Sequence, residues 1–250
     1  MSVRRQRRVL MTPCQDETIE ACETAGRCLQ CPWTVTRGNT LRVLTIFCHP
    51  ERESFTGALL DAFLSGLEDA RHAWDLADLH REGFDPRFRP DDFAQFTKGP
   101  GAMPPDVLCE QERVMRADAI AFVFPVWWWS FPAMLKGWID RVWCQGWAYD
   151  FTIRQSRGLL TLERAVLLCS AGSSAATYRR YGYQEAMRRS IDVGVLGYCG
   201  IDDVAMHIFP GVDDDSDARP AWLAMARKIG RNMTAKPPAP AMSYRSLPNM

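Results

Sequence analysis

Short apolar runs alternate with amphipathic segments along residues 41–233, and this alternation limits the fold more than any other feature of the chain. The first run, LRVLTIF at residues 41–47, is rich in branched side chains and is followed by His49-Pro50, as expected for a buried strand. Strands that alternate with helices form a mainly parallel sheet with helices on both faces. The sequence therefore predicts an α/β fold with a five-stranded, mainly parallel sheet.

The other expected elements follow from the same patterns. Ser54 has the side chain of a helix N-cap, and Leu60, Leu64 and Leu67 after it lie on one helical face. Residues 81–105 are rich in Gly, Pro and Asp, which favours a long surface loop. The remaining expected strands are residues 73–79, 119–124, 164–170 and 204–209, and the remaining expected helices are residues 106–116, 131–143, 184–195 and 220–233.

The two ends of the chain differ from its middle. We expect residues 1–40 to be a disordered leader, residues 41–235 to form one domain, and the proline-rich residues 236–250 to be a flexible tail. The leader contains four cysteines, and Cys28-x-x-Cys31 has a spacing that zinc can use. No histidine lies nearby and no second close pair completes a site, so we expect no metal.

Composition excludes several functions. The 250 residues contain 30 Lys and Arg against 30 Asp and Glu, so no net charge favours nucleic acid or an anionic membrane as a partner. Nine cysteines without a repeating spacing argue against a secreted disulfide framework and favour a reducing cytoplasm. Residues 119–135 are uncharged, but this stretch contains Pro125 and Pro132 and is shorter than the roughly 20 residues of a membrane span.

Three turns are the expected ligand site, because ligands of parallel sheets bind beyond the carboxyl ends of the strands. They are residues 49–56, 125–131 and 170–183, which follow the first, third and fourth expected strands. The sequence contains no G-x-G-x-x-G after a strand, no phosphate-binding G-x-x-x-x-G-K-[ST] and no G-x-S-x-G. A conventional dinucleotide fold, a P-loop enzyme and an α/β-hydrolase are therefore disfavoured.

The composition of these turns suits a flat cofactor that carries a phosphate. The first turn ends at a helix N-terminus, which favours an anion, and His49, Ser54 and Thr56 add side-chain donors. The second turn supplies three consecutive tryptophans at 127–129, which strict alternation along a strand cannot bury on one face. The small residues near Gly172 let the backbone approach a ring closely. Together the turns predict a flavin site.

Several motifs in order carry a family resemblance. They are His49-Pro50 with Ser54-Phe55, GFDP at residues 83–86, FPVWWWSFPA at 124–133, LKGWIDRV at 135–142 and GWAYDF at 146–151. In these motifs the chain resembles the NAD(P)H quinone reductase family of flavodoxin-like flavoproteins. The resemblance implies a dimeric flavodoxin-like fold, bound FAD or FMN, and transfer of two electrons, as hydride, from NAD(P)H to a quinone or a similar flat acceptor.

The resemblance also implies roles for particular residues. Tyr178 aligns with a tyrosine that hydrogen-bonds where charge develops on the reduced flavin, and Trp128 shapes the pocket that nicotinamide and acceptor occupy in turn. The histidine that accompanies this tyrosine in the family is absent, and Thr56 replaces an asparagine, so the acceptor and the choice of FAD or FMN stay open. The implied cofactor-binding residues are His49, Ser54, Phe55, Thr56, Pro125, Val126, Trp127, Trp128, Trp129, Ser170, Ala171, Gly172 and Ser173.

Two alternative functions stay open, and the sequence also predicts a homodimer. Some relatives are ancillary subunits of potassium efflux systems, and a flavodoxin-type electron carrier is a further alternative, although such carriers are usually acidic and this chain is neutral. The sequence offers more aromatic surface than one flavin can cover, which predicts a homodimer with a shared site. We expect Trp138 and Trp143, which lie on a helix, to pack in the core or at the dimer interface. The residues expected to supply the aromatic surface are Trp127, Trp128, Trp129, Trp143, Trp147 and Tyr149.

Overall fold

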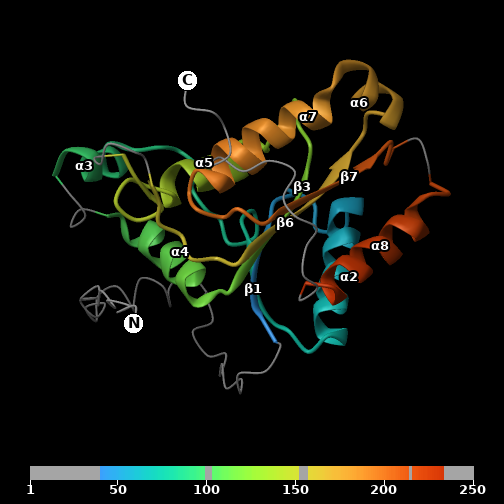
Figure 1. The fold of residues 1–250 in the computed structure, drawn as a ribbon, viewed down its shortest axis with the longest axis horizontal. Coiled ribbons are helices and arrows are strands. Elements are labelled where there is room, and N and C mark those ends of the chain that lie inside the picture. The colour runs from blue at the N-terminus through green and yellow to red at the C-terminus, as the bar shows by residue number, and fades with distance from the viewer. Residues whose placement is uncertain (1–39, 99–102, 152–156, 214–215, 234–250) are drawn as a thin grey trace, which may run out of the picture.

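The structure is a computed structural model and describes residues 40–98, 103–151, 157–213 and 216–233. The expectations of a disordered leader and a flexible tail fall outside these residues. The strands and helices of these residues are drawn in Figure 1.

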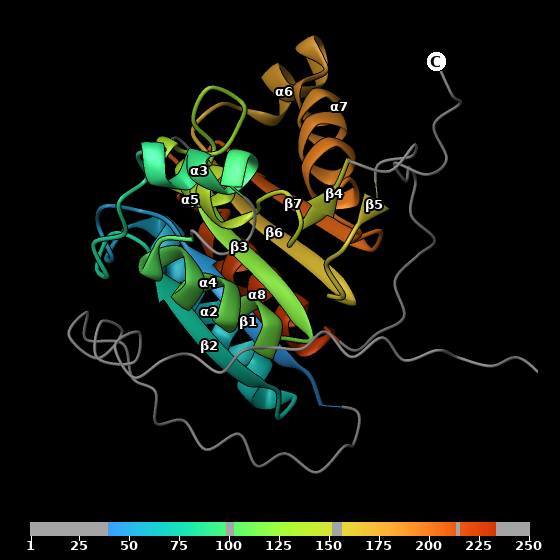
Figure 2. The ribbon, with the colours of Figure 1, turned by 90° about the vertical axis from the view of Figure 1, so that its left-hand side faces the viewer.

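A five-stranded parallel sheet forms the centre of the molecule, with strand order β2-β1-β3-β6-β7. Every pairing between neighbouring strands of this sheet is parallel, and Figure 2 shows the strands side by side. The order reverses beside β1, which is the arrangement of flavodoxin-like proteins. The predicted five-stranded α/β fold is confirmed. The strands are β1 (Arg42–Phe47), β2 (Ala73–Asp78), β3 (Ala119–Pro125), β6 (Arg164–Ala171) and β7 (Val204–Pro210).

Helices cover both faces of this sheet (Figure 1). The central strand β3 is buried on both sides: Ile120, Phe122 and Phe124 pack into one core cluster, and Ala121 and Val123 pack into the other. Burial on two faces explains why this strand is continuously apolar. One face is covered by α2 (Phe55–Asp69) and α8 (Arg219–Arg231), and the other by α4 (Pro105–Arg116), α5 (Ala133–Val142) and η1 (Arg188–Gly197).

The expectation of a long loop at residues 81–105 is wrong, because this segment contains helix α3 (Pro90–Lys98). Asp92 is fully buried at the start of this helix, and both of its carboxylate oxygens accept bonds from Arg141 Nε, at 3.0 and 3.1 Å. Arg141 also donates to Asp106 at 2.7 Å. The helix is thus held by partners far away in the sequence, which local composition does not reveal.

Two further segments differ from expectation. Part of the expected turn at residues 170–183 is a helix, α6 (Ala175–Tyr181), which is capped by Ser174 and ended by Gly182 at φ 67°. The helix expected at 184–195 is α7 (Tyr183–Met187) continuing into the π-helix η1. A hairpin of β4 (Tyr149–Asp150) and β5 (Arg157–Gly158) was not expected, because two-residue strands carry no periodic signal.

The tryptophans of α5 and its C-cap belong to the core. Trp138 is fully buried and donates from Nε1 to Glu110 at 2.9 Å, and Trp143 is 4% exposed. Trp143 therefore cannot supply exposed surface for a dimer, and that part of the assembly argument is wrong. Lys136 and Asp140, four residues apart on α5, form an exposed ion pair with 2.5 Å between Nζ and Oδ1.

None of the helices in the described ranges is long and apolar enough to cross a bilayer. Within the same ranges, no three His, Cys, Asp or Glu side chains gather as a group that could hold a metal ion. The cysteines of the leader lie outside the described residues.

Candidate active site

A cavity of about 480 Å³ lies at the carboxyl edge of the sheet, where the turns after β1, β3, β6 and β7 meet. Every residue expected at the cofactor site, and Tyr178, lines this one cavity. The structure therefore brings together segments that are widely separated in sequence. The lining residues are His49, Ser54, Phe55, Thr56, Pro125, Val126, Trp127, Trp128, Trp129, Ser170, Ala171, Gly172, Ser173, Tyr178, Val212 and Asp213.

The turn after β1 presents the N-terminus of α2 to the cavity. Ser54 is the N-cap, as expected, and its Oγ accepts the Gly57 amide at 3.2 Å. The first amides of a helix have no acceptor inside it, so this end favours an anion. His49 is fixed by its own turn, since Nδ1 lies 2.8 Å from the carbonyl oxygen and 3.0 Å from the amide nitrogen of Glu51. This leaves Nε2 of the ring for other contacts.

Thr56 joins two of the turns. Its Oγ1 lies 2.7 Å from Oγ of Ser170, and both residues are buried. Since Ser170 is the penultimate residue of strand β6, this bond fixes the α2 N-terminus against the start of the third turn. Thr56 is therefore a structural link between the turns in addition to a cavity-lining residue.

The turn after β3 has an unusual backbone. Trp128 and Trp129 have φ values of 52° and 55°, and the Ser130 amide donates to the Trp127 carbonyl at 3.1 Å. Two consecutive positive φ values fit a type I′ turn, where Asn and Gly are the usual residues. The turn leaves Trp128 86% exposed and Trp127 46% exposed. These two indoles therefore stand at the rim of the cavity and outside the core.

Some backbone amides of this turn donate hydrogen bonds within the protein, and others do not. Val126 donates to the Ser170 carbonyl at 2.7 Å, and Trp127 donates to the Ser130 carbonyl at 3.4 Å. Among residues 126–130, Trp128 and Trp129 are those whose amides make no such bond. They are the backbone donors that remain for a ligand.

The turns after β6 and β7 are bound to each other. The Gly211 amide donates to Ser173 at 3.0 Å, and the Val212 amide donates to Ala171 at 3.1 Å. A Cβ at Gly172 would lie 2.6 Å from Oδ2 of Asp213, so a side chain there would displace the carboxylate. Val212 and Asp213 were missed by the sequence reasoning. They follow the fifth strand, and the carboxyl-edge rule applied to that strand as well would have found them.

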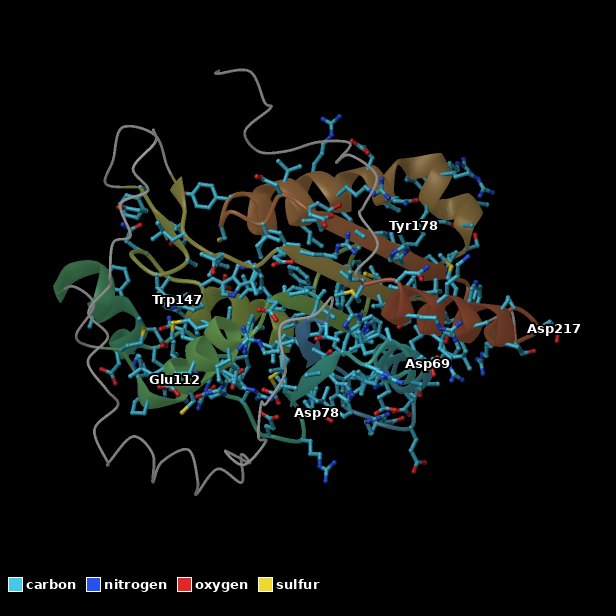
Figure 3. The ribbon with its side chains drawn as sticks, turned by 60° about the horizontal axis from the view of Figure 1, so that its bottom comes forward. Asp69, Asp78, Glu112, Trp147, Tyr178 and Asp217 are labelled. Carbon is cyan, nitrogen blue, oxygen red and sulfur yellow. The ribbon has the colours of Figure 1, made fainter. Side chains whose placement is uncertain are left out.

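Tyr178 lies on α6 and lines the cavity, with a side chain that is 5% exposed. Burial raises the pKa of its hydroxyl to about 12. The hydroxyl therefore keeps its proton at neutral pH and can donate a hydrogen bond. Trp147 is not among the residues that line this cavity, and Figure 3 labels it on the other side of the view from Tyr178.

The strand order and the cavity at its carboxyl edge define a flavodoxin-like α/β protein, and residues 41–232 match the family described as Flavodoxin-like fold. Ribosyldihydronicotinamide dehydrogenase (quinone) of Mus musculus is 30% identical, over 70% of this chain and 84% of its own length. NAD(P)H:quinone oxidoreductase of Methanothermobacter marburgensis is 37% identical with a TM-score of 0.73, covering 78% of this chain and 99% of that one. The FMN-dependent NADH-azoreductase of Bacillus anthracis, solved with FMN, covers 78% of this chain and 97% of that one at 16% identity and a TM-score of 0.59, and shares the fold alone.

The chain belongs to the NAD(P)H quinone reductase family of flavodoxin-like proteins and is an oxidoreductase. The resemblance predicted from the motifs is confirmed.

Trp128→Gly should make the protein more stable and less active. The free energy of unfolding should rise by about 1 kcal/mol, because glycine removes the left-handed strain and an 86% exposed indole loses little burial. The kcat/KM for a flat acceptor should fall about fivefold or more with the loss of an aromatic partner worth about 1 kcal/mol. Urea unfolding and steady-state kinetics measure the two effects. Arg71→Gly, at φ 60° and away from the cavity, is the control and should change stability alone.

Proposed function

We propose that this chain binds a flavin in the 480 Å³ cavity and transfers a hydride from NAD(P)H to a quinone or a similarly flat acceptor. The observation that carries the proposal is the meeting of a capped helix N-terminus and an exposed aromatic turn in one cavity. The first suits a phosphate and the second suits a flat ring. A flavin needs both features in one site.

The residues present fit such a cofactor. The volume lies within the roughly 300–1,000 Å³ of small-molecule sites. The absence of a side chain at Gly172 keeps the wall open, since a Cβ there would collide with Asp213. The proposal covers FMN and FAD, which share the ring and its first phosphate. Mass spectrometry of the released cofactor distinguishes them.

Each group of residues has a task in this proposal. When bound, the flavin supplies the two-electron chemistry. The α2 N-terminus, with Ser54, holds the phosphate, and the amides of Trp128 and Trp129 hold the polar edge of the ring. Tyr178 donates a hydrogen bond where negative charge develops. The indole of Trp128 orients flat substrates and excludes water, so that nicotinamide and acceptor occupy the same place in turn.

The visible spectrum of the purified protein tests the proposal. A bound flavin that bleaches rapidly under anaerobic NADH or NADPH, and recovers its colour with a quinone, is the expected result. A flavin that bleaches only with dithionite would favour the electron carrier or the ancillary subunit. A colourless protein that cannot be reconstituted with FMN or FAD would refute the proposal entirely.

We also propose a homodimer in the cytoplasm. Trp127 and Trp128 are exposed at the cavity rim, and Phe151 is 55% exposed beyond β4. Trp147 and Tyr149 are only half-buried, although both pack partly against the core. Such surfaces favour burial between two copies. The cytoplasmic location rests on the scattered cysteines of the sequence.

Trp147→Ala should weaken both dimerisation and turnover while much of the flavin stays bound. Trp147 does not line the cavity of its own chain, so in this proposal it contributes to turnover through a site shared by two copies. Analytical ultracentrifugation and activity assays at matched concentrations measure both. A fully active monomer would exclude the shared site, and an unaltered dimer would move the interface away from Trp147.

A further inference from the structure

A series of aromatic rings leads out of the cavity along the surface. Trp129, which lines the cavity, is stacked on Tyr183 with 4.0 Å between ring centroids. Tyr183 lies 5.5 Å from Tyr181, whose side chain is 58% exposed. Tyr178 also contacts this series, with its ring 6.3 Å from that of Tyr183. The aromatic surface therefore continues from the proposed flavin site to a flat, exposed ring on α6.

Positive charge accompanies the outer end of this series. Arg179 and Arg180 are exposed in the last turn of α6, and the guanidinium of Arg180 lies 5.4 Å from the centre of the Tyr181 ring. Among the residues that the structure describes, neither arginine has an ion-pair partner, whereas Arg189 pairs with Glu185 at 3.0 Å. A guanidinium with free donors binds phosphate in a fork. An aromatic face beside it binds a purine by stacking.

The stability of α6 explains its two C-terminal arginines but not the aromatic residues next to them. Cations near a helix C-terminus favour the helix dipole, which explains two arginines in the last turn. The dipole does not require an exposed tyrosine beside them, nor the ring contacts that connect this tyrosine through Tyr183 to Trp129. Together, an aromatic ring and free guanidinium groups next to a redox cavity suit a ligand that ends in a phosphorylated purine nucleoside.

We propose that Arg179, Arg180 and Tyr181 form a ledge that binds the 2′-phosphoadenosine end of NADPH and makes NADPH the preferred hydride donor. This inference rests on the proposed function, which places the nicotinamide in the cavity. The dinucleotide runs from Trp129 past Tyr183, the adenine stacks on Tyr181, and the guanidinium groups hold the 2′-phosphate. NADH lacks that phosphate and gains nothing from the arginines.

Two measurements on Arg179→Ala/Arg180→Ala test the ledge. The ratio of kcat/KM for NADPH to that for NADH should fall at least tenfold, mainly through the KM for NADPH, because a charge-assisted bond to phosphate is lost. Calorimetry with adenosine 2′,5′-bisphosphate, which needs no turnover, should show binding to the parent protein and at least tenfold weaker binding to the variant. Lys228→Ala removes one exposed charge in the last turn of α8 and should change neither.

The outcomes separate the two proposals. An unchanged ratio together with unchanged bisphosphate binding would overturn the ledge, even if both nucleotides still reduce the flavin. A loss confined to anionic acceptors would overturn it as well and assign the arginines to the acceptor. A protein that neither nucleotide reduces would refute the proposed function, and the calorimetric measurement would still decide whether the ledge binds a phosphorylated nucleoside. Tyr181→Ala should weaken bisphosphate binding in the same direction, and Tyr181→Phe should restore it.

Discussion

Arg141→Met should lower the free energy of unfolding by about 3–5 kcal/mol. The Arg141 side chain is fully buried and donates to Asp92, to Asp106 at 2.7 Å and to the backbone carbonyl of Asp85 at 2.7 Å. Without the guanidinium, the fully buried carboxylate of Asp92 keeps only the Arg89 amide at 2.7 Å and the Arg89 guanidinium at 3.8 Å as its partners among the described residues. The cost is therefore that of a buried charge that has lost its principal partner, which exceeds the value of the pair itself.

Urea unfolding of the variant and its parent measures this difference. The matched control is Lys136→Met on the same helix, because Lys136 forms an exposed pair with Asp140 and should cost less than about 1 kcal/mol. Adding Asp92→Leu to Arg141→Met should recover part of the loss, since the unpaired charge is then removed. If Arg141→Met and Lys136→Met lowered the free energy of unfolding equally, the hydrogen bonds of Arg141 would not be what holds α3.

Gly57→Ala should weaken flavin binding by about tenfold to a hundredfold. A Cβ at Gly57 would lie 1.8 Å from the backbone oxygen of Arg52, so the turn between β1 and α2 must move. Overpacking of this kind costs about 1–3 kcal/mol. The displaced turn contains Ser54, whose Oγ accepts the Gly57 amide. The substitution therefore displaces the proposed phosphate site directly.

Fluorescence titration with FMN and with FAD measures the affinity. Gly66→Ala provides a control in the same helix, because its Cβ would lie 2.1 Å from the Arg227 backbone oxygen, where α2 packs against α8. That substitution should lower stability without a comparable loss of flavin affinity. Equal flavin affinity of Gly57→Ala and the parent would place the phosphate away from the α2 N-terminus.

Most of the sheet and many helix limits could be predicted from sequence, because they depend on neighbours along the chain. Strands such as β3 are buried on both faces and are therefore uninterrupted apolar runs. Ser54 caps α2 as its side chain predicts. The candidate site could be located for a related reason: parallel strands bring their carboxyl ends to one edge, so the turns after the first, third and fourth strands had to meet.

Only the tertiary structure decided the features that depend on partners far apart in sequence. Helix α3 is held by Arg141, 49 residues away from Asp92, and Thr56 bonds Ser170 across 114 residues. The aromatic residues show the same limit most clearly. Trp128 and Trp143 are chemically alike, yet one is 86% exposed on a strained turn and the other is 4% exposed in the core. The sequence by itself determined that flat aromatic side chains gather near the end of β3, whereas packing across the sheet decided which of them reach the cavity.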